Sequence, residues 1–102
     1  MTDFEKKVLA LANKIPSGKV TTYKLLAKKL GRSKASRAVA NALRKNPSLI
    51  KIPCHRVIKS DGQVGGYQLG EAKKLKILMA EGIELGKNHK IKNLKKFLFT
   101  YD

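Results

Sequence analysis

Hydrophobic residues recur with helical spacing at the start of the chain, and lysines occupy positions between them. The apolar positions are Phe4, Val8, Leu11 and Ile15. Thr2 and Glu5 have the spacing of a capping box, in which each side chain bonds the other residue's backbone N–H. The pattern therefore predicts a first helix that begins after Thr2 and is ended by Pro16-Ser17-Gly18.

Two further helices follow closely. Residues 23–30 form the first, with Thr22 as its cap and Gly31 as its terminator. Ser33 can cap the second, which runs to about Lys45 and stops before Asn46-Pro47. Two short helices joined by a glycine-containing link predict a helix-turn-helix. Many such pairs bind no nucleic acid, so the pattern alone is weak evidence of function.

The third helix has two distinct faces. Its predicted buried face consists of Ala35, Ala38, Val39, Ala42 and Leu43. Another face carries Arg37, Asn41 and Arg44, flanked by Ser36 and Ala40. Arginines among small residues suit close approach to a duplex. An ordinary solvated helix face is the alternative, and the pattern by itself favours it.

The second half of the chain mixes turn and helix signals. Residues 49–52 are apolar and β-branched, and segments 57–59 and 63–65 flank the turn signal Ser60-Asp61-Gly62, which predicts a short hairpin. A fourth helix is predicted from about Gly70 to Glu81, with these residues inward: Ala72, Leu75, Leu78 and Met79. The expected fold is mainly α with a short β-hairpin, a winged-helix-like helix-turn-helix domain over residues 1–85. The basic tail, 86–102, is an extra DNA-binding arm, a strand packed on the domain or a frayed terminus.

The charge composition indicates which class of partner the protein binds. The 102 residues contain 23 lysines and arginines against 7 acidic residues, which gives a net charge of +16. Such a field points first to nucleic acid and second to an anionic membrane surface, with a lysine-rich, merely solvated surface as the alternative. No apolar run approaches the roughly 20 residues of a membrane span. We expect a cytoplasmic protein, nucleoid-associated or nuclear in a eukaryote, because the sequence has no signal-peptide core and its single cysteine suits a reducing compartment.

The candidate chemistry lies in Pro53-Cys54-His55-Arg56-Val57, which contains the only cysteine beside one of two histidines. A neighbouring imidazole or cation commonly lowers a thiol pKa and so activates it as a nucleophile. In a regular strand the two side chains would point to opposite faces, but Pro53 suggests a turn or strand end where that rule relaxes. A water relay is equally consistent, and so is a small buried cysteine without chemistry. One cysteine and two histidines are too few for a structural zinc site.

This stretch resembles the active-site signature of the O6-alkylguanine-DNA alkyltransferases, and the likeness extends over roughly residues 4–85. It implies the family's C-terminal DNA-binding and catalytic domain, which flips alkylated guanine out of the duplex and transfers the alkyl group irreversibly to Cys54. By this resemblance His55 is the base, acting through water, and Glu81 orients His55. Protonating the departing guanine assists the reaction, and the Tyr23 hydroxyl is the candidate donor. No metal or organic cofactor is expected.

The resemblance also assigns the remaining contacts. Arg37 fills the gap left by the flipped base, and the recognition helix enters the minor groove through Ser36, Arg37, Ala40, Asn41 and Arg44. The implied substrate pocket comprises Asn46, Val57, Tyr67 and Gln68. The expected partner is double-stranded DNA containing O6-alkylguanine, bound by a monomer. Two departures are the absence of the N-terminal domain of longer members and Ala40-Asn41 where many relatives have two glycines.

Three other functions remain open. Alkyltransferase-like proteins share this short size and recognise alkylated guanine without accepting the alkyl group, but typically replace the cysteine, often with tryptophan. A regulatory helix-turn-helix DNA-binding protein with an incidental cysteine is the second. A cysteine hydrolase is the poorest, since no oxyanion-binding arrangement is evident.

Overall fold

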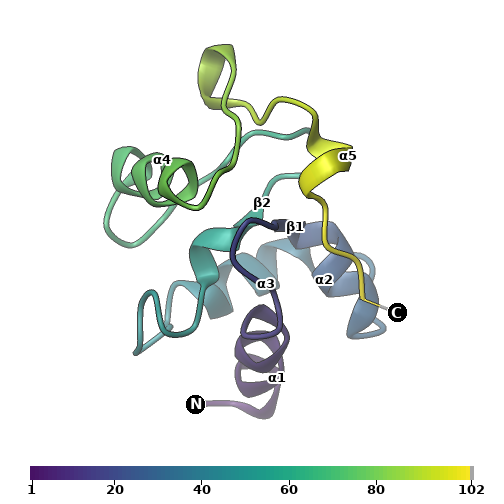
Figure 1. Ribbon diagram of the computed structural model, residues 1–102. Helices are drawn as coiled ribbons and strands as arrows, with labels where there is room; N and C mark the ends of the chain where they lie inside the picture. The colour runs from purple at the N-terminus through teal and green to yellow at the C-terminus, as the bar shows by residue number, and fades with distance from the viewer. Residues whose placement is uncertain (102) are drawn as a thin grey trace.

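The computed structural model describes residues 1–101. Its elements are α1 (Asp3–Ala12), β1 (Thr21–Thr22), α2 (Tyr23–Lys29), α3 (Ser36–Leu43), the 3-10 turn η1 (Cys54–Arg56), β2 (Val57–Ile58), α4 (Glu71–Ala80), the 3-10 turn η2 (Lys87–His89) and α5 (Leu94–Phe97). Helices α1, α2 and α3 lie on one side of the short sheet, and α4 and α5 lie on the other (Figure 1). No helix in the described part of the chain has both the length and the apolar character needed to cross a membrane.

The caps of the first two helices are confirmed. Thr2 Oγ1 accepts from Glu5 N at 3.1 Å, while Glu5 Oε1 accepts from Thr2 N at 2.8 Å, which completes the capping box. Thr22 Oγ1 caps α2 by accepting from Leu25 N at 3.0 Å.

The prediction that Ser33 caps α3 is wrong. The Ala35 N–H bonds Arg32 O at 2.8 Å and closes a turn there, so the helix begins only at Ser36 and has no side-chain cap. Ala38, predicted to be buried, is exposed. The buried residues of α3, which packs on α1 and α2, are Val39, Ala42 and Leu43, and the Ala38 side faces solvent.

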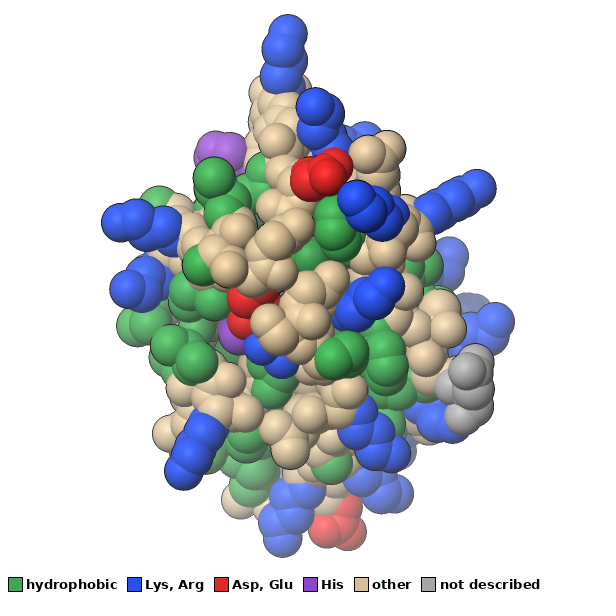
Figure 2. Space-filling model, viewed as in Figure 1, with side chains coloured by type: hydrophobic (Ala, Val, Ile, Leu, Met, Phe, Trp, Pro, Cys, Tyr) green, Lys and Arg blue, Asp and Glu red, His purple; other side chains and the backbone are tan. Residues whose placement is uncertain are grey.

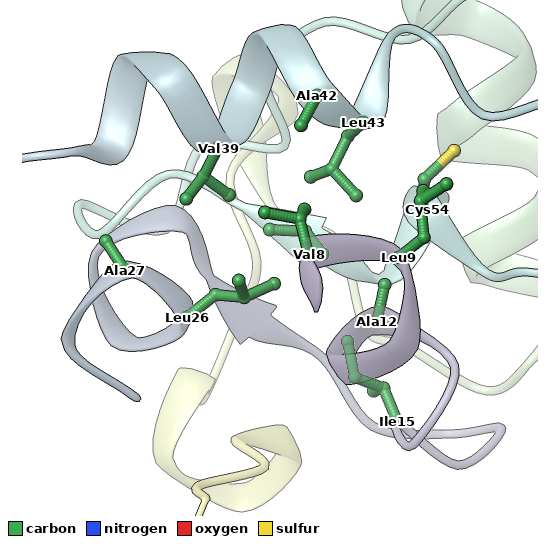
Figure 3. Close-up of a cluster of buried hydrophobic side chains, with 11 residues drawn as sticks. Val8, Leu9, Ala12, Ile15, Leu26, Ala27, Val39, Ala42, Leu43 and Cys54 are labelled. Atoms are coloured by element: carbon green, nitrogen blue, oxygen red, sulfur yellow. The ribbon is translucent and has the colours of Figure 1, made fainter. Parts of the chain in front are cut away.

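The three helices enclose one apolar cluster (Figure 3). Val8 from α1, Leu26 from α2 and Val39 from α3 are each 0% exposed and meet at its centre. Cys54 and Val57 belong to the same cluster, so the segment that carries the cysteine is anchored in the helix-turn-helix core. Burial of each such side chain contributes roughly 1.5–3 kcal/mol to folding.

The sheet differs from the predicted hairpin. β1 and β2 pair in parallel, with Thr21 opposite Val57 and Thr22 opposite Ile58. The turn itself is present, since Lys59 N donates to Gln63 O at 2.9 Å, but the segment after it pairs with Lys90 instead of returning along β2. Parallel pairs are favoured where helices cover both faces, and both β1 residues and both β2 residues are buried here. The mainly α fold with a small sheet is confirmed, while its β component is a parallel pair.

A second apolar cluster joins α4 to the C-terminal segment. Its buried members are Val20, Ile58, Val64, Leu78, Ile83, Ile91 and Phe97. Two predicted inward residues of α4 are in fact exposed: Ala72, and Met79 at 61%. Lys74, one turn before Leu78, takes the inward position, with consequences described below.

The described part of the basic tail packs on the domain. Val20 N donates to Phe97 O at 2.9 Å, and Phe99 N donates to Val20 O at 2.7 Å, which places the tail parallel to the segment leading into β1. Tyr101 Oη donates to Leu11 O at 2.7 Å and ties the tail to α1. The tail is therefore a structural part of the domain.

Replacing Phe97 by alanine tests how far the tail supports the fold. Phe97 is 7% exposed within the second cluster, so Phe97→Ala should lower the free energy of unfolding by about 3–5 kcal/mol. The exposed neighbour Lys95→Ala should change it by less than about 0.5 kcal/mol. Urea unfolding followed by circular dichroism measures both, and equal stabilities would show that the tail adds nothing to the core.

Candidate active site

Cys54 is the first residue of η1 and not part of a strand. Its N–H bonds Ile52 O at 2.8 Å, and Arg56 N bonds Pro53 O at 2.9 Å, so the chain turns directly after the proline. The alternation of side chains in a strand therefore does not separate Cys54 from His55. Cys54 is 6% exposed, and its sulfur points away from Leu9 and Ala12 (Figure 3).

Cys54 opens into a pocket of about 340 Å³, part of it open to solvent. Its lining comes from α2, α3, η1 and the loop before α4: Tyr23, Ala40, Leu43, Arg44, Cys54, Gly66, Tyr67 and Gln68. Gly65, at φ +75°, lets this loop lie against α2, because a Cβ there would be 3.3 Å from Tyr23 Oη. The pocket thus combines one thiol, two phenols and one guanidinium, with no carboxylate among its lining residues.

His55 lies in the interior behind the pocket and faces α4. Its ring is fully buried, and Nε2 is 3.0 Å from Glu81 Oε2 at the C-terminal end of α4. Arg56 bonds the same carboxylate twice, from Nε to Oε1 at 2.9 Å and from Nη2 to Oε2 at 2.6 Å. The three residues form a connected polar group, and the bonds within it offset the free-energy cost of burying their charges.

Protonation follows from these contacts. Burial works to raise the pKa of Glu81, but hydrogen bonds and positive charge from Arg56 and His55 outweigh it, and the pKa lies below its ordinary value. Burial lowers the pKa of His55 despite the neighbouring carboxylate. An ionised Glu81 accepts from Nε2–H, so the neutral imidazole has an acceptor at Nδ1. Nδ1 is buried and makes no hydrogen bond within the described residues.

Cys54 and Tyr23 both retain their protons. Burial raises the pKa of the Cys54 thiol, and the Asn46 amide and the Lys74 charge offset this only in part. Burial, with the nearby Cys54, also raises the pKa of the Tyr23 phenol. A thiol in this setting needs a base to become a nucleophile.

Lys74 is a site residue that sequence reasoning missed. Its side chain is 0% exposed, and Nζ donates to Val57 O at 2.8 Å and to Gly66 O at 3.1 Å, with Tyr23 Oη at 3.5 Å. It therefore joins the cysteine segment, the pocket loop and α2. Burial lowers the pKa of Lys74 from 10.5 to about 8, so it remains mainly charged at neutral pH. The available signal was a lysine one turn before Leu78, on the buried side of α4.

The structure brings most of the predicted site together, with two corrections. Tyr23, Tyr67 and Gln68 line the pocket with Cys54, whereas His55 and Glu81 lie behind it. Val57, predicted as a pocket residue, is not among the lining residues: its side chain is fully buried in the core, and its carbonyl accepts from Lys74 Nζ at 2.8 Å. Asn46 is not a lining residue either. Its side chain closes the loop before the cysteine, donating to Ile52 O at 2.8 Å and accepting from Ser48 N at 2.9 Å.

The predicted DNA-facing residues follow α3 from the pocket outward. Ala40 and Arg44 border the pocket, while Arg37 and Asn41 are exposed and Ser36 is half-buried. Arg44 Nη1 donates to Asn41 Oδ1 at 3.0 Å, so the asparagine holds the arginine beside the opening. The two arginines of this segment, Arg37 and Arg44, are both exposed and suit a polyanion. Basic side chains also project around the edge of the face shown in Figure 2, where few acidic ones appear.

Residues 3–83 match the family model of the 6-O-methylguanine DNA methyltransferase DNA-binding domain. The chain belongs to this family. A match over 81 of the 102 residues shows that the likeness extends far beyond the active-site stretch.

Known relatives agree. The methylated-DNA–protein-cysteine methyltransferase of Methanothermobacter thermautotrophicus is 44% identical over 84 residues, which cover 82% of this chain and 47% of that protein. The crystal structure of Mycobacterium tuberculosis OGT in complex with DNA gives a TM-score of 0.77 at 38% identity, covering 79% of this chain and 50% of that one. The chain spans about half the length of these relatives.

A third similarity covers nearly the whole of both chains. The structure of S. pombe Atl1 in complex with damaged DNA containing O6-carboxymethylguanine gives a TM-score of 0.84 at 31% identity. It covers 99% of this chain and 98% of that one.

The buried Lys74 charge predicts a distinct pH dependence of stability. Between pH 8 and 10.5 the unfolded chain holds the Lys74 proton and the folded chain does not, so stability rises with pH. Relative to Lys74→Met, the free energy of unfolding of the unsubstituted protein should rise by at most about 1.4 kcal/mol per pH unit in this window. The exposed neighbour Lys73→Met should keep the original slope. Urea unfolding at several pH values measures it, and parallel profiles for Lys74→Met would contradict the buried charge.

Proposed function

We propose that this protein repairs DNA by rotating O6-alkylguanine out of the duplex and transferring its alkyl group to Cys54 in a single, irreversible turnover. The observation that carries the proposal is the position of the thiol. Cys54 lies in a pocket that α3 residues and two tyrosines also line, with a buried histidine–glutamate pair behind it. A regulatory DNA-binding protein has no need of this arrangement.

The transfer is a displacement at carbon. The Cys54 sulfur forms a bond to the alkyl carbon as the bond from that carbon to guanine O6 breaks, and the electron pair of that bond leaves with guanine. The thiol proton passes through water to His55 Nδ1, which is the acceptor in the tautomer that Glu81 selects. The product is a thioether, for which no cleavage chemistry is evident, so each molecule reacts once.

The departing guanine gains a proton from Tyr23. The raised pKa of the Tyr23 phenol keeps it protonated until the departing base develops negative charge. The Lys74 ammonium, 3.5 Å from Tyr23 Oη, then stabilises the phenolate that remains. Lys74 also holds the Gly66 carbonyl, and thereby the loop that presents Tyr67 to the flipped base. Stacking on such a ring contributes about 1–3 kcal/mol.

A second candidate is recognition without transfer. It is favoured by the similarity to S. pombe Atl1 along almost the entire chain, and by the raised pKa of the Cys54 thiol, which makes it a poor nucleophile unless His55 assists. The protein would then bind alkylated guanine and mark it for other repair proteins. Both candidates require double-stranded DNA as the partner.

Mass spectrometry separates the candidates. Incubating the reduced protein with duplex containing O6-methylguanine should add the mass of one methyl group to Cys54, and the duplex should lose its modification. Cys54→Ser should gain no mass yet still prefer the alkylated duplex, because a serine hydroxyl has a far higher pKa and does not ionise here. If the reduced protein binds that duplex and gains no mass, the second candidate is correct.

Substitution of Arg37 tests base rotation. Arg37 is exposed on α3, where it can occupy the space that the extruded base leaves. Arg37→Ala should slow transfer from duplex roughly tenfold, the effect of losing about 1.4 kcal/mol of compensation. Transfer from a single strand, which needs little extrusion, should stay about unchanged. Lys28→Ala, an exposed lysine of α2, controls for the lost charge, and equal slowing on both substrates would remove Arg37 from this role.

A further inference from the structure

Arg56 joins three parts of the fold and is not used by the proposed reaction. Two of its nitrogens bind both oxygens of Glu81, as described above, and Nη1 donates to Ile15 O at 2.7 Å. The guanidinium thus connects η1, the end of α4 and the loop after α1. Its side chain is only 15% exposed, so little water competes for these bonds.

The decisive feature is a shared oxygen. Glu81 Oε2 accepts from Arg56 Nη2 at 2.6 Å and from His55 Nε2 at 3.0 Å. A carboxylate with the histidine as its single partner could rotate or take up a proton. The two parallel bonds to the planar guanidinium fix its plane and keep it ionised.

Arg56 opposes the effect of Glu81 on the protonation of His55. Glu81 at the end of α4 favours a proton on the imidazole, whereas Arg56 beside it and Lys74 in α4 disfavour one. Two further titratable groups lie close to His55: Cys54, adjacent in the chain, and Tyr67, whose ring centroid is 6.4 Å from that of His55. Without Arg56, Glu81 would face His55 unneutralised and the pair would hold a proton more tightly.

We propose that Arg56 is a positioning residue for alkyl transfer: it clamps Glu81 so that His55 stays neutral, with Nε2 as donor and Nδ1 free to accept the thiol proton. The kinetic part of this inference rests on the proposed transfer function. The state of His55 does not, and it can be measured in the protein without DNA.

The competing explanation is a purely structural one. Through Ile15 O, Arg56 could serve only to fasten the loop after α1. That role predicts lower stability on substitution and no change in the titration of His55.

Nitrogen-15 NMR of the imidazole distinguishes the two explanations. The unsubstituted protein should show neutral His55 with its proton on Nε2. Arg56→Met removes the charge and should raise the pH midpoint of His55 by about one unit. Arg56→Lys keeps the charge and should stay nearer the original midpoint, while Lys76→Met, an exposed lysine of α4, should leave it unchanged. An unchanged midpoint in folded Arg56→Met would overturn the proposal, and Arg56→Gln serves as the neutral variant should Arg56→Met not fold.

Single-turnover kinetics with saturating O6-methylguanine duplex supply the second readout. Because protonated His55 cannot accept the thiol proton, the acid limb of the pH–rate profile should move to higher pH in Arg56→Met, with transfer about tenfold slower below the midpoint. In the Glu81→Gln background the same substitution should have little further effect, since Arg56 acts through that carboxylate. Equal slowing in both backgrounds would assign Arg56 to the structural role. If the unsubstituted protein transfers nothing, the proposed function fails and the NMR titration still decides the proposal.

Discussion

The parallel pairing of Thr21–Thr22 with Val57–Ile58 is the constraint on which the site depends. Tyr23 begins α2 directly after β1, and η1, which carries Cys54, ends directly before β2. Pairing the two strands therefore brings the phenol and the thiol to one pocket, although 30 residues lie between them. The buried Lys74 secures the same junction from α4 through Val57 O and Tyr23 Oη.

The groups around Cys54 have pKa values that suit the proposed transfer. Both the thiol and the Tyr23 phenol have raised pKa values because they are buried, so neither reacts readily with solvent species. His55 has the opposite shift and stays neutral. Groups whose pKa values are moved apart in this way suit an exchange of protons in both directions, one to the leaving base and one from the nucleophile.

The caps at Thr2 and Thr22 and the cysteine motif were predicted correctly because they depend on residues within a few positions of one another. Helix periodicity located the helices but not all of their buried faces, since Ala38, Ala72 and Met79 are exposed. The parallel sheet was missed because a two-residue strand has no detectable period and its partner is distant. Lys74 was missed because a lysine in a helix is usually solvated, and only the three-dimensional structure shows the carbonyls that receive it. The two bonds that Arg56 makes to Glu81 join residues 25 positions apart and could not be read from the motif.

The C-terminal segment has a consequence for the order of folding. Its bonds join Val20 to Phe97 and Phe99, and Leu11 to Tyr101, across most of the chain. Contacts between such distant positions carry a large loop-closure cost and slow folding. During synthesis the helix-turn-helix core can assemble early, because α1, α2 and α3 are consecutive. The contacts of this core with the C-terminal segment form only after residues 97–101 have left the ribosome. Until residues 97–99 are available, the backbone N–H and carbonyl of Val20, directly before β1, lack these partners.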